Sequence, residues 1–153
     1  MLKRIFAVIL ALTQVGCMRE DNTTTNKNLR WAIDERNVAA VDALLATGAF
    51  IDEQDFEGRT PLITATVTDQ FVIAEKLIDR GADVMAADQF GTSALEFIAT
   101  SREVDYSPDG QARLRIVARI EAAGLPYPPP PRDMVVKLRE SGMWKSAYLT
   151  KLH

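Results

Sequence analysis

The strongest constraint in this sequence is an internal repeat with a period of 33 residues. Residues 55–62 (DFEGRTPL) align at this offset with residues 88–95 (DQFGTSAL). The same offset joins Leu29 to Leu62, Ala32 to Ala65, Leu44-Leu45 to Leu77-Ile78, and Gly48-Ala49 to Gly81-Ala82. A fixed period of roughly 20–50 residues is typical of chains in which each unit buries its apolar face against its neighbours. The repeat therefore predicts a stack of similar units.

Each unit carries the signals of two short helices. Thr60 precedes Pro61, so its hydroxyl can cap a helix that has proline in the first helical position. Apolar residues at helical spacing over 72–78 predict the second helix of this unit, and residues 38–46 predict the equivalent helix one unit earlier. Gly48 and Gly81 follow these helices, where a left-handed residue is favoured.

The period and these residues resemble ankyrin repeats, whose unit has about 33 residues and a Thr-Pro-Leu-His-x-Ala motif. The pattern D-x-x-G-x-T-P-L-x-x-A over residues 55–65 carries the resemblance. It implies an all-α ankyrin-repeat solenoid of about three helix-turn-helix units over residues 28–127. The third unit holds an insertion of about ten residues, which fits the turn-rich segment 101–111. Ile63 and Glu96 replace the motif histidine, so a histidine network between repeats is not expected.

The first 17 residues are expected to be a targeting signal. Lys3 and Arg4 precede eight apolar residues, and Gly16-Cys17 ends the segment. This plan resembles a bacterial lipoprotein signal, which implies cleavage before Cys17 and lipidation of that residue, although Gln14 stands where such signals usually have Leu. An ordinary signal peptide and an uncleaved segment are the alternatives. Residues 18–27 predict a flexible tether. The residue that follows Cys17 is Met18 and not Asp, which, by resemblance to Gram-negative lipoproteins, favours delivery to the outer membrane.

The segment after the repeats predicts a cap. Prolines at 126 and 128–131 predict a stiff spacer, and Asp133 is a candidate helix cap. Apolar residues over 135–149 predict a degenerate helix pair that closes the open end of the stack. The alternative is an amphipathic helix on a membrane surface, with the basic side chains of Lys137, Arg139, Lys145 and Lys151.

Composition removes several classes of enzyme. The chain has one Cys and one His, which excludes an intrachain disulfide, a Cys-rich zinc site and a triad built on an internal histidine, because His153 is the last residue. The acidic run 52–57 lacks the spacing of a calcium loop. We therefore expect no catalytic residues, no metal and no cofactor, and the net charge of −3 argues against nucleic-acid binding.

Charge is unevenly distributed. Residues 29–99 hold 13 acids and five bases, whereas residues 100–153 hold six acids and nine bases. This asymmetry suggests an acidic surface for a partner, with solvated helix faces as the alternative.

The resemblance implies protein binding through the hairpin tips and the first helices of the units. We therefore expect a monomeric, non-catalytic interaction module in the bacterial envelope, facing the periplasm, whose partner has a basic surface. An accessory or immunity-type role is the favoured version, and the alternative is an envelope-organising protein whose basic C-terminal part contacts membrane or cell wall. The positions expected to bind the partner are Asp34, Glu35, Asp52, Glu53, Gln54, Phe56, Glu57, Arg59, Val67, Thr68, Ala87, Gln89, Phe90 and Thr92.

Overall fold

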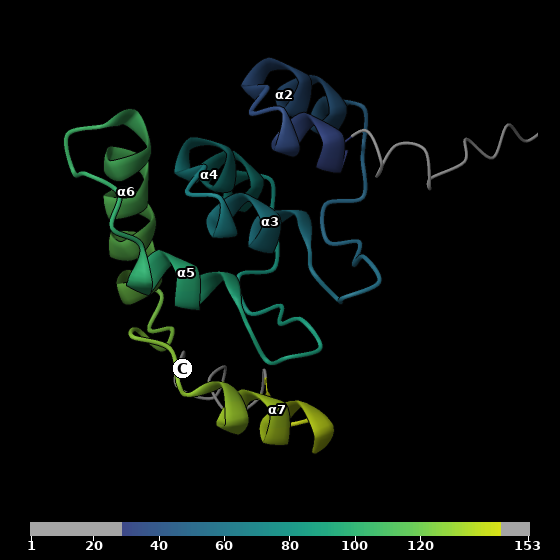
Figure 1. Cartoon of the computed structure of the whole chain (residues 1–153), viewed down its shortest axis with the longest axis vertical. Coiled ribbons are helices and arrows are strands. Elements are labelled where there is room, and N and C mark those ends of the chain that lie inside the picture. Colours follow the sequence, from purple (N-terminus) through teal and green to yellow (C-terminus); the bar gives the residue numbers. More distant parts are fainter. Residues whose placement is uncertain (1–28, 145–153) are drawn as a thin grey trace, which may run out of the picture.

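The computed structural model describes residues 29–144, which form an all-α ankyrin-repeat solenoid (Figure 1). Three helical pairs follow one another along the stack. The first pair is residues 29–34 with α2 (Val38–Ala46), the second is α3 (Pro61–Val67) with α4 (Phe71–Asp79), and the third is α5 (Ala94–Thr100) with α6 (Pro108–Ala122). A further helix, α7 (Arg132–Glu140), follows them. The three expected units are therefore confirmed.

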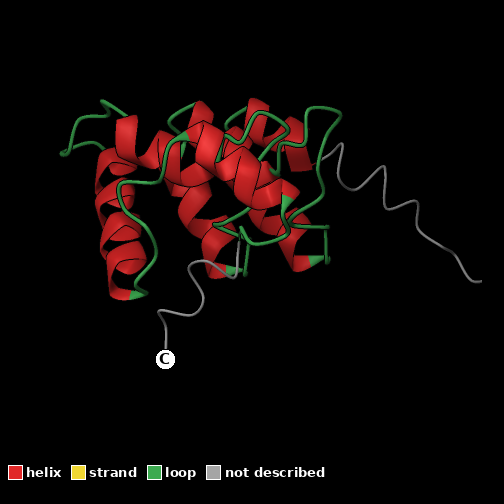
Figure 2. Ribbon diagram, turned by 90° about the horizontal axis from the view of Figure 1, so that it is seen from below, coloured by secondary structure: helices red, strands yellow, loops and turns green. Residues whose placement is uncertain are grey.

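Long loops join one pair to the next. Residues 47–60 and 80–93, here called the finger loops, extend from the same side of the stack in Figure 1. Figure 2 shows the described chain as helices and loops, and its one strand-like feature within residues 29–144 is an isolated antiparallel bridge between Ala87 and Ser93.

The helices begin where capping residues stand. Thr60 Oγ1 accepts a hydrogen bond from the amide of Ile63 at 3.3 Å, and Pro61 follows as the first residue of α3, as the sequence predicts. Asn37 caps α2 in the same way, because its Oδ1 accepts from the amide of Ala40 at 3.0 Å.

Tight turns join the two helices within a unit, and two of these turns hold a left-handed residue. Arg36 and Asp69 both have φ of 53°, and they stand one repeat period apart. The Arg36 guanidinium donates to the carbonyl of Thr68 at 2.7 Å, and Asp69 Oδ1 accepts from the hydroxyl of Ser101 at 2.6 Å. Each turn is therefore tied to the next unit.

The core runs continuously through the stack. Phe71, Leu62, Leu77 and Leu95 are fully buried, together with Leu29 of the first unit. Each such side chain contributes roughly 1.5–3 kcal/mol when it leaves water. Because every unit shares this core with its neighbour, packing between units adds to the stability of each helical pair.

The insertion in the third unit differs from its prediction as a loop. Residues 101–107 form a loop, but Pro108 already begins α6, which therefore has 15 residues. The reason is a second capped start, since Ser107 Oγ accepts from the amide of Gly110 at 2.8 Å and proline follows it. A Cβ at residue 110 would lie 1.9 Å from the carbonyl oxygen of Val104, so only glycine fits there.

Helix α7 covers the second finger loop. Val135 of α7 is buried, Arg139 donates to the carbonyls of Ala87 and Asp88, and Trp144 Nε1 donates to the carbonyl of Met85 at 2.5 Å. The cap thus extends the loop layer of the stack. Its second expected helix, with Lys145 and Lys151, lies outside the described residues, as do the targeting signal at 1–17 and the tether at 18–27.

One detail of the cap was predicted wrongly. Pro131 is the N-cap of α7 and provides no side-chain acceptor, whereas Asp133 stands in the first turn of the helix. Its carboxylate lies 3.6 Å from Lys137 one turn later. Since the proline spacer fixes where the helix can begin, the carboxylate is placed inside the helix and not before it.

Candidate functional site

A buried or half-buried aspartate organises the turn of each finger loop. Asp55 Oδ1 accepts from the amides of Glu57 at 2.9 Å and Arg59 at 2.8 Å. Asp88 Oδ1 accepts in the same way from Phe90 at 2.9 Å and Thr92 at 2.8 Å. Asp-x-x-Gly is a turn sequence with a mechanism, because the carboxylate bonds to its own following backbone while glycine takes the positive φ. The two turns are therefore built alike.

The finger loops are tied to each other and to the helices. The amide of Gln89 donates to the carbonyl of Glu57 at 3.0 Å, which joins the two loops directly. Arg30, on the helix of the first unit, bonds to Asp55 Oδ2 at 3.1 Å and to the carbonyl of Arg59 at 3.1 Å. These bonds fix the spacing between the two turns.

Each finger turn presents one phenylalanine to solvent. Phe56 is 91% exposed and Phe90 is 55% exposed. The rings therefore do not fold back to fill their own loops, and Gln89 is exposed beside Phe90. Exposed aromatic side chains on a fixed backbone are suitable anchors for a protein partner.

The other predicted positions fall into three groups. Asp34, Glu35, Glu53, Gln54 and Val67 are exposed. Asp52, Glu57, Arg59 and Thr68 are partly buried and already bonded: Asp52 accepts from the amide of Asp83, Glu57 pairs with Arg59 at 2.8 Å, and the Thr68 hydroxyl donates to the carbonyl of Thr64.

Ala87 and Thr92 form the third group, and for them the expectation of an exposed side chain is wrong. Both are only 5% exposed. Both lie in the second finger turn, where the Thr92 carbonyl accepts from the Asp88 amide at 2.9 Å. Helix α7 lies against this turn, because Arg139 donates to the Ala87 carbonyl and Val136 lies beside Gly91. The cap therefore removes these two positions from the accessible surface.

Two further aromatic side chains on the first helices of their units were missed by the sequence reasoning: Trp31 is exposed, and Phe97 is partly buried against the core. Trp31 is 56% exposed on the first helix of its unit, and Phe97 occupies the same repeat position two periods later. Phe97 lines a cavity of about 300 Å³ between α3 and α5, together with Val67. The repeat alignment could have found them, because positions 31 and 97 follow the buried motif residues by a constant step.

The charge asymmetry is used in part within the molecule. Arg115 pairs with Glu75 at 2.7 Å, Arg119 with Asp79 at 2.7 Å, and Arg132 with Glu96 at 2.7 Å. In each pair a base from the second half meets an acid from the first half. The expected acidic surface is therefore smaller than the sequence count suggests. Its remaining exposed carboxylates near the predicted site include Asp34, Glu35 and Glu53.

Two of these ion pairs perturb their arginines. A hydrogen bond with Glu75 raises the pKa of Arg115 above its ordinary value, and a hydrogen bond with Glu96 does the same for the pKa of Arg132. Both groups stay charged throughout the physiological range, so these shifts give no pH switch.

The described residues carry little sign of metal or membrane chemistry. Within residues 29–144 no group of three or more His, Cys, Asp or Glu side chains is arranged to hold a metal ion. In the same range no helix has the length and apolar character needed to cross a bilayer.

Comparison with known proteins identifies one repeat directly. Residues 57–89 match the ankyrin repeat family. A stretch of 54 residues, 35% of this chain, is 43% identical to the human Transient receptor potential cation channel subfamily A member 1, of which it covers 5%. A stretch of 55 residues, 36% of the chain, is 44% identical to Neurogenic locus notch homolog protein 1 of Xenopus laevis and covers 2% of it. The chain thus spans only a small fraction of these relatives, and the likeness concerns the repeats.

Proposed function

We propose that this chain is a protein-binding module held in the bacterial envelope by a lipid on Cys17, where it recognises one protein partner as an accessory or immunity-type binder. An ankyrin repeat indicates a protein–protein interaction module, and repeats of this family are generally not catalytic. The observation that carries the proposal is the pair of exposed rings, Phe56 and Phe90, on finger loops joined by a backbone hydrogen bond.

The chemistry of the partner follows from what surrounds the two rings. Glu53 and Gln54 are exposed on the first finger loop, and Gln89 is exposed on the second. An aromatic centre with a polar and acidic border fits a partner that offers an apolar depression with basic side chains at its rim. Such a partner would bury both rings while its basic groups stay near water.

Removing the two rings is expected to weaken partner capture strongly. In the double variant Phe56→Ala, Phe90→Ala, we expect at least about a tenfold loss of affinity, because buried aromatic anchors typically contribute more than ~1 kcal/mol each. The measurement is cross-linking of the full-length protein in an envelope extract, followed by quantitative mass spectrometry of the captured partner.

Tyr106→Ala is the matched control for this experiment. Tyr106 is 88% exposed, comparable to Phe56, but it lies in the loop of the third unit and not on a finger loop. Capture should survive this change. Equal loss in the control, or unchanged capture in the double variant, would contradict the assignment of the finger loops as the binding surface.

The targeting signal has its own test at Cys17. We expect the mature N-terminal peptide of the wild-type protein to carry a glyceryl-linked acyl group. We expect Cys17→Ser to lack it, because the sulfur atom of Cys17 is the atom that is alkylated. Intact-mass spectrometry of both proteins, expressed in a Gram-negative host, measures this. An unmodified chain that begins at Met1 would contradict the targeting signal and leave the finger-loop proposal standing.

The envelope-organising alternative has less support from the cap. A membrane-surface helix needs a free apolar face, whereas α7 packs Val135 into the fold. Arg139 is occupied by the carbonyls of the second finger loop. These contacts favour α7 as a structural cap.

A further inference from the structure

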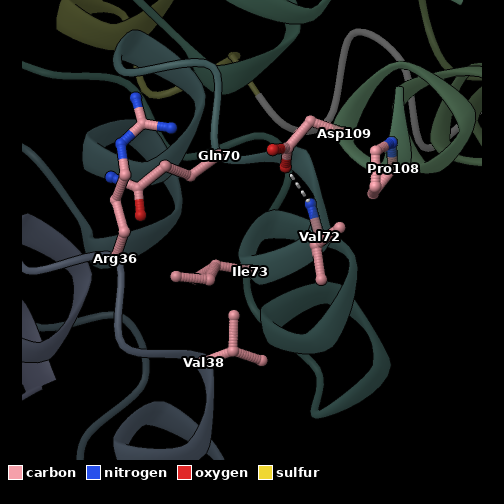
Figure 3. Close-up of a pocket in the computed structure, with 7 residues that line it drawn as sticks. All are labelled: Arg36, Val38, Gln70, Val72, Ile73, Pro108 and Asp109. Atoms are coloured by element: carbon pink, nitrogen blue, oxygen red, sulfur yellow. Dashed lines mark hydrogen bonds between the residues drawn. The ribbon is translucent and has the colours of Figure 1, made fainter. Parts of the chain in front are cut away.

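A cavity of about 310 Å³ lies at the ends of the helices opposite the finger loops. It opens where the turns within the first two units meet the start of α6 (Figure 3). Polar and apolar side chains from all three units line it: Arg36, Val38, Gln70, Val72, Ile73, Pro108 and Asp109. It is therefore separate from the surface proposed to bind a protein.

Gln70 brings an unsatisfied acceptor to this cavity. The residue is only 4% exposed, and its Oε1 is buried without a hydrogen-bond partner among the described residues. Its Nε2 donates to the Thr68 hydroxyl at 2.8 Å, while that hydroxyl donates to the carbonyl of Thr64 at 3.0 Å. With the Thr68 hydrogen directed to helix carbonyls, Thr68 acts as acceptor toward Gln70 Nε2, and Oε1 is the unpaired atom.

Opposite charges stand on the two sides of Gln70. Figure 3 shows Arg36 on one side of the cavity and Asp109 on the other, with the Gln70 side chain between them in this view. Arg36 is held by its bond to the carbonyl of Thr68 at 2.7 Å, and it keeps a left-handed backbone with φ of 53°. Asp109 is held by the amide of Val72, from which its Oδ1 accepts at 2.8 Å. Both charged groups are thus fixed from the backbone.

The remaining lining is aliphatic. Val38, Val72 and Ile73 lie below the polar groups in Figure 3, and Pro108 lies beside Asp109. The volume stands at the lower end of the range for ligand pockets, roughly 300–1,000 Å³. A small molecule fits such a space, whereas a nucleotide-sized cofactor exceeds it.

We infer that this cavity binds a small zwitterion, a free α-amino acid with an aliphatic side chain. A lone anion would meet the carboxylate of Asp109, and a lone cation would meet the guanidinium of Arg36. A free amino acid carries both charges: its carboxylate faces Arg36, its ammonium group donates to Asp109, and a shift of the Gln70 side chain lets the buried Oε1 accept from the same ammonium group. Its aliphatic side chain then covers Val38 and Ile73. Each charged or apolar part of the cavity thus faces a ligand group of complementary charge or polarity.

The test uses methyl-labelled full-length protein and L-leucine as the probe. Leucine at about 10 mM, enough to saturate a site with Kd near ~1 mM, should shift the methyl resonances of Val38, Val72 and Ile73 in a saturable manner. Leucinamide lacks the carboxylate and N-acetylleucine lacks the ammonium group. Each of these should bind at least about tenfold more weakly than leucine.

Variants separate binding from folding. Arg36→Asn removes the cation while asparagine tolerates the left-handed backbone. We therefore expect a folded protein with slightly lower stability, because it loses only the exposed bond to the Thr68 carbonyl, and at least a tenfold weaker response to leucine. The control is Arg80→Asn, which removes an exposed arginine at the end of α4, away from the cavity lining, and should leave binding intact.

Gln70→Met fills the same space without the acceptor and should also weaken binding. Unsaturable shifts, equal binding of leucinamide, or full binding by a folded Arg36→Asn variant would each overturn the inference. None of these outcomes bears on the finger-loop proposal, because the two surfaces share no residue.

Discussion

Gly91→Ala should destabilise the protein by about 2–4 kcal/mol and release α7 from the second finger loop. Gly91 has φ of +77°, and a Cβ there would lie 2.7 Å from the carbonyl oxygen of Arg132 and 2.7 Å from Val136 Cγ2. A left-handed alanine costs roughly 1–2 kcal/mol, and overpacking adds roughly 1–3 kcal/mol. Both penalties act where α7 contacts the second finger loop. The effect should therefore exceed that of an ordinary glycine replacement.

Gly81→Ala separates the two penalties. Gly81 has a similar φ of +90°, but a Cβ added there would meet no atom within 4 Å. It should cost only about 1–2 kcal/mol. Urea unfolding measures both variants, and the fluorescence of Trp144, 4% exposed against Met85, reports release of the cap when Trp31 is replaced by Phe in all proteins compared. Equal destabilisation by the two changes would show that α7 does not press on Gly91.

Asp88→Ala should destabilise the protein by about 2–4 kcal/mol. Asp88 is only 3% exposed, and its carboxylate accepts from the amides of Phe90 and Thr92. Alanine would leave those donors without their partner in a site that α7 covers. An unsatisfied buried donor costs roughly 1–3 kcal/mol, and hydrogen bonds to charged groups contribute roughly 1.5–3 kcal/mol. The measurement is the free energy of unfolding in urea.

Asp88→Asn is the informative partner of that variant. The asparagine Oδ1 can accept from the same two amides, so we expect it to recover more than half of the lost stability. Because the turn also carries Phe90, capture of the protein partner should follow stability across the pair. If asparagine proved as damaging as alanine, the negative charge of Asp88, and not its acceptor geometry, would be the stabilising feature.

Features that depend on residues within one repeat period could be predicted from the sequence. The second helix of the first unit runs over Val38–Ala46 as predicted, and Thr60 caps α3 through its hydroxyl. These features depend on residues three or four positions apart, whose spacing fixes their geometry. The aromatic residues after Asp55 and Asp88 were also readable, since the turn chemistry that exposes Phe56 is local.

Features that join distant segments were not readable in the same way. The Arg139 contact with Ala87 spans 52 residues, and the Trp144 contact with Met85 spans 59. Nothing in the sequence around Ala87 marks it as covered by a later helix, so its side chain was expected to be accessible. The ion pair between Arg115 and Glu75, 40 residues apart, likewise uses a carboxylate of the half that was expected to offer an acidic surface. Such outcomes depend on how the whole stack closes.

The position of α7 gives the two ends of the stack different folding behaviour. Trp144 bonds to Met85 and Arg132 pairs with Glu96, so the last segment closes a chain loop around the third unit. Unfolding of that unit gains less chain entropy while the loop stays closed, so we expect it to be coupled to release of the last segment. The first unit is joined to the second by nearest-neighbour links such as Asp42 with Lys76. In a quasi-one-dimensional array, such an end frays first. Amide exchange should therefore fall progressively from α2 toward α6, as a gradient set by topology and not by local helix propensity.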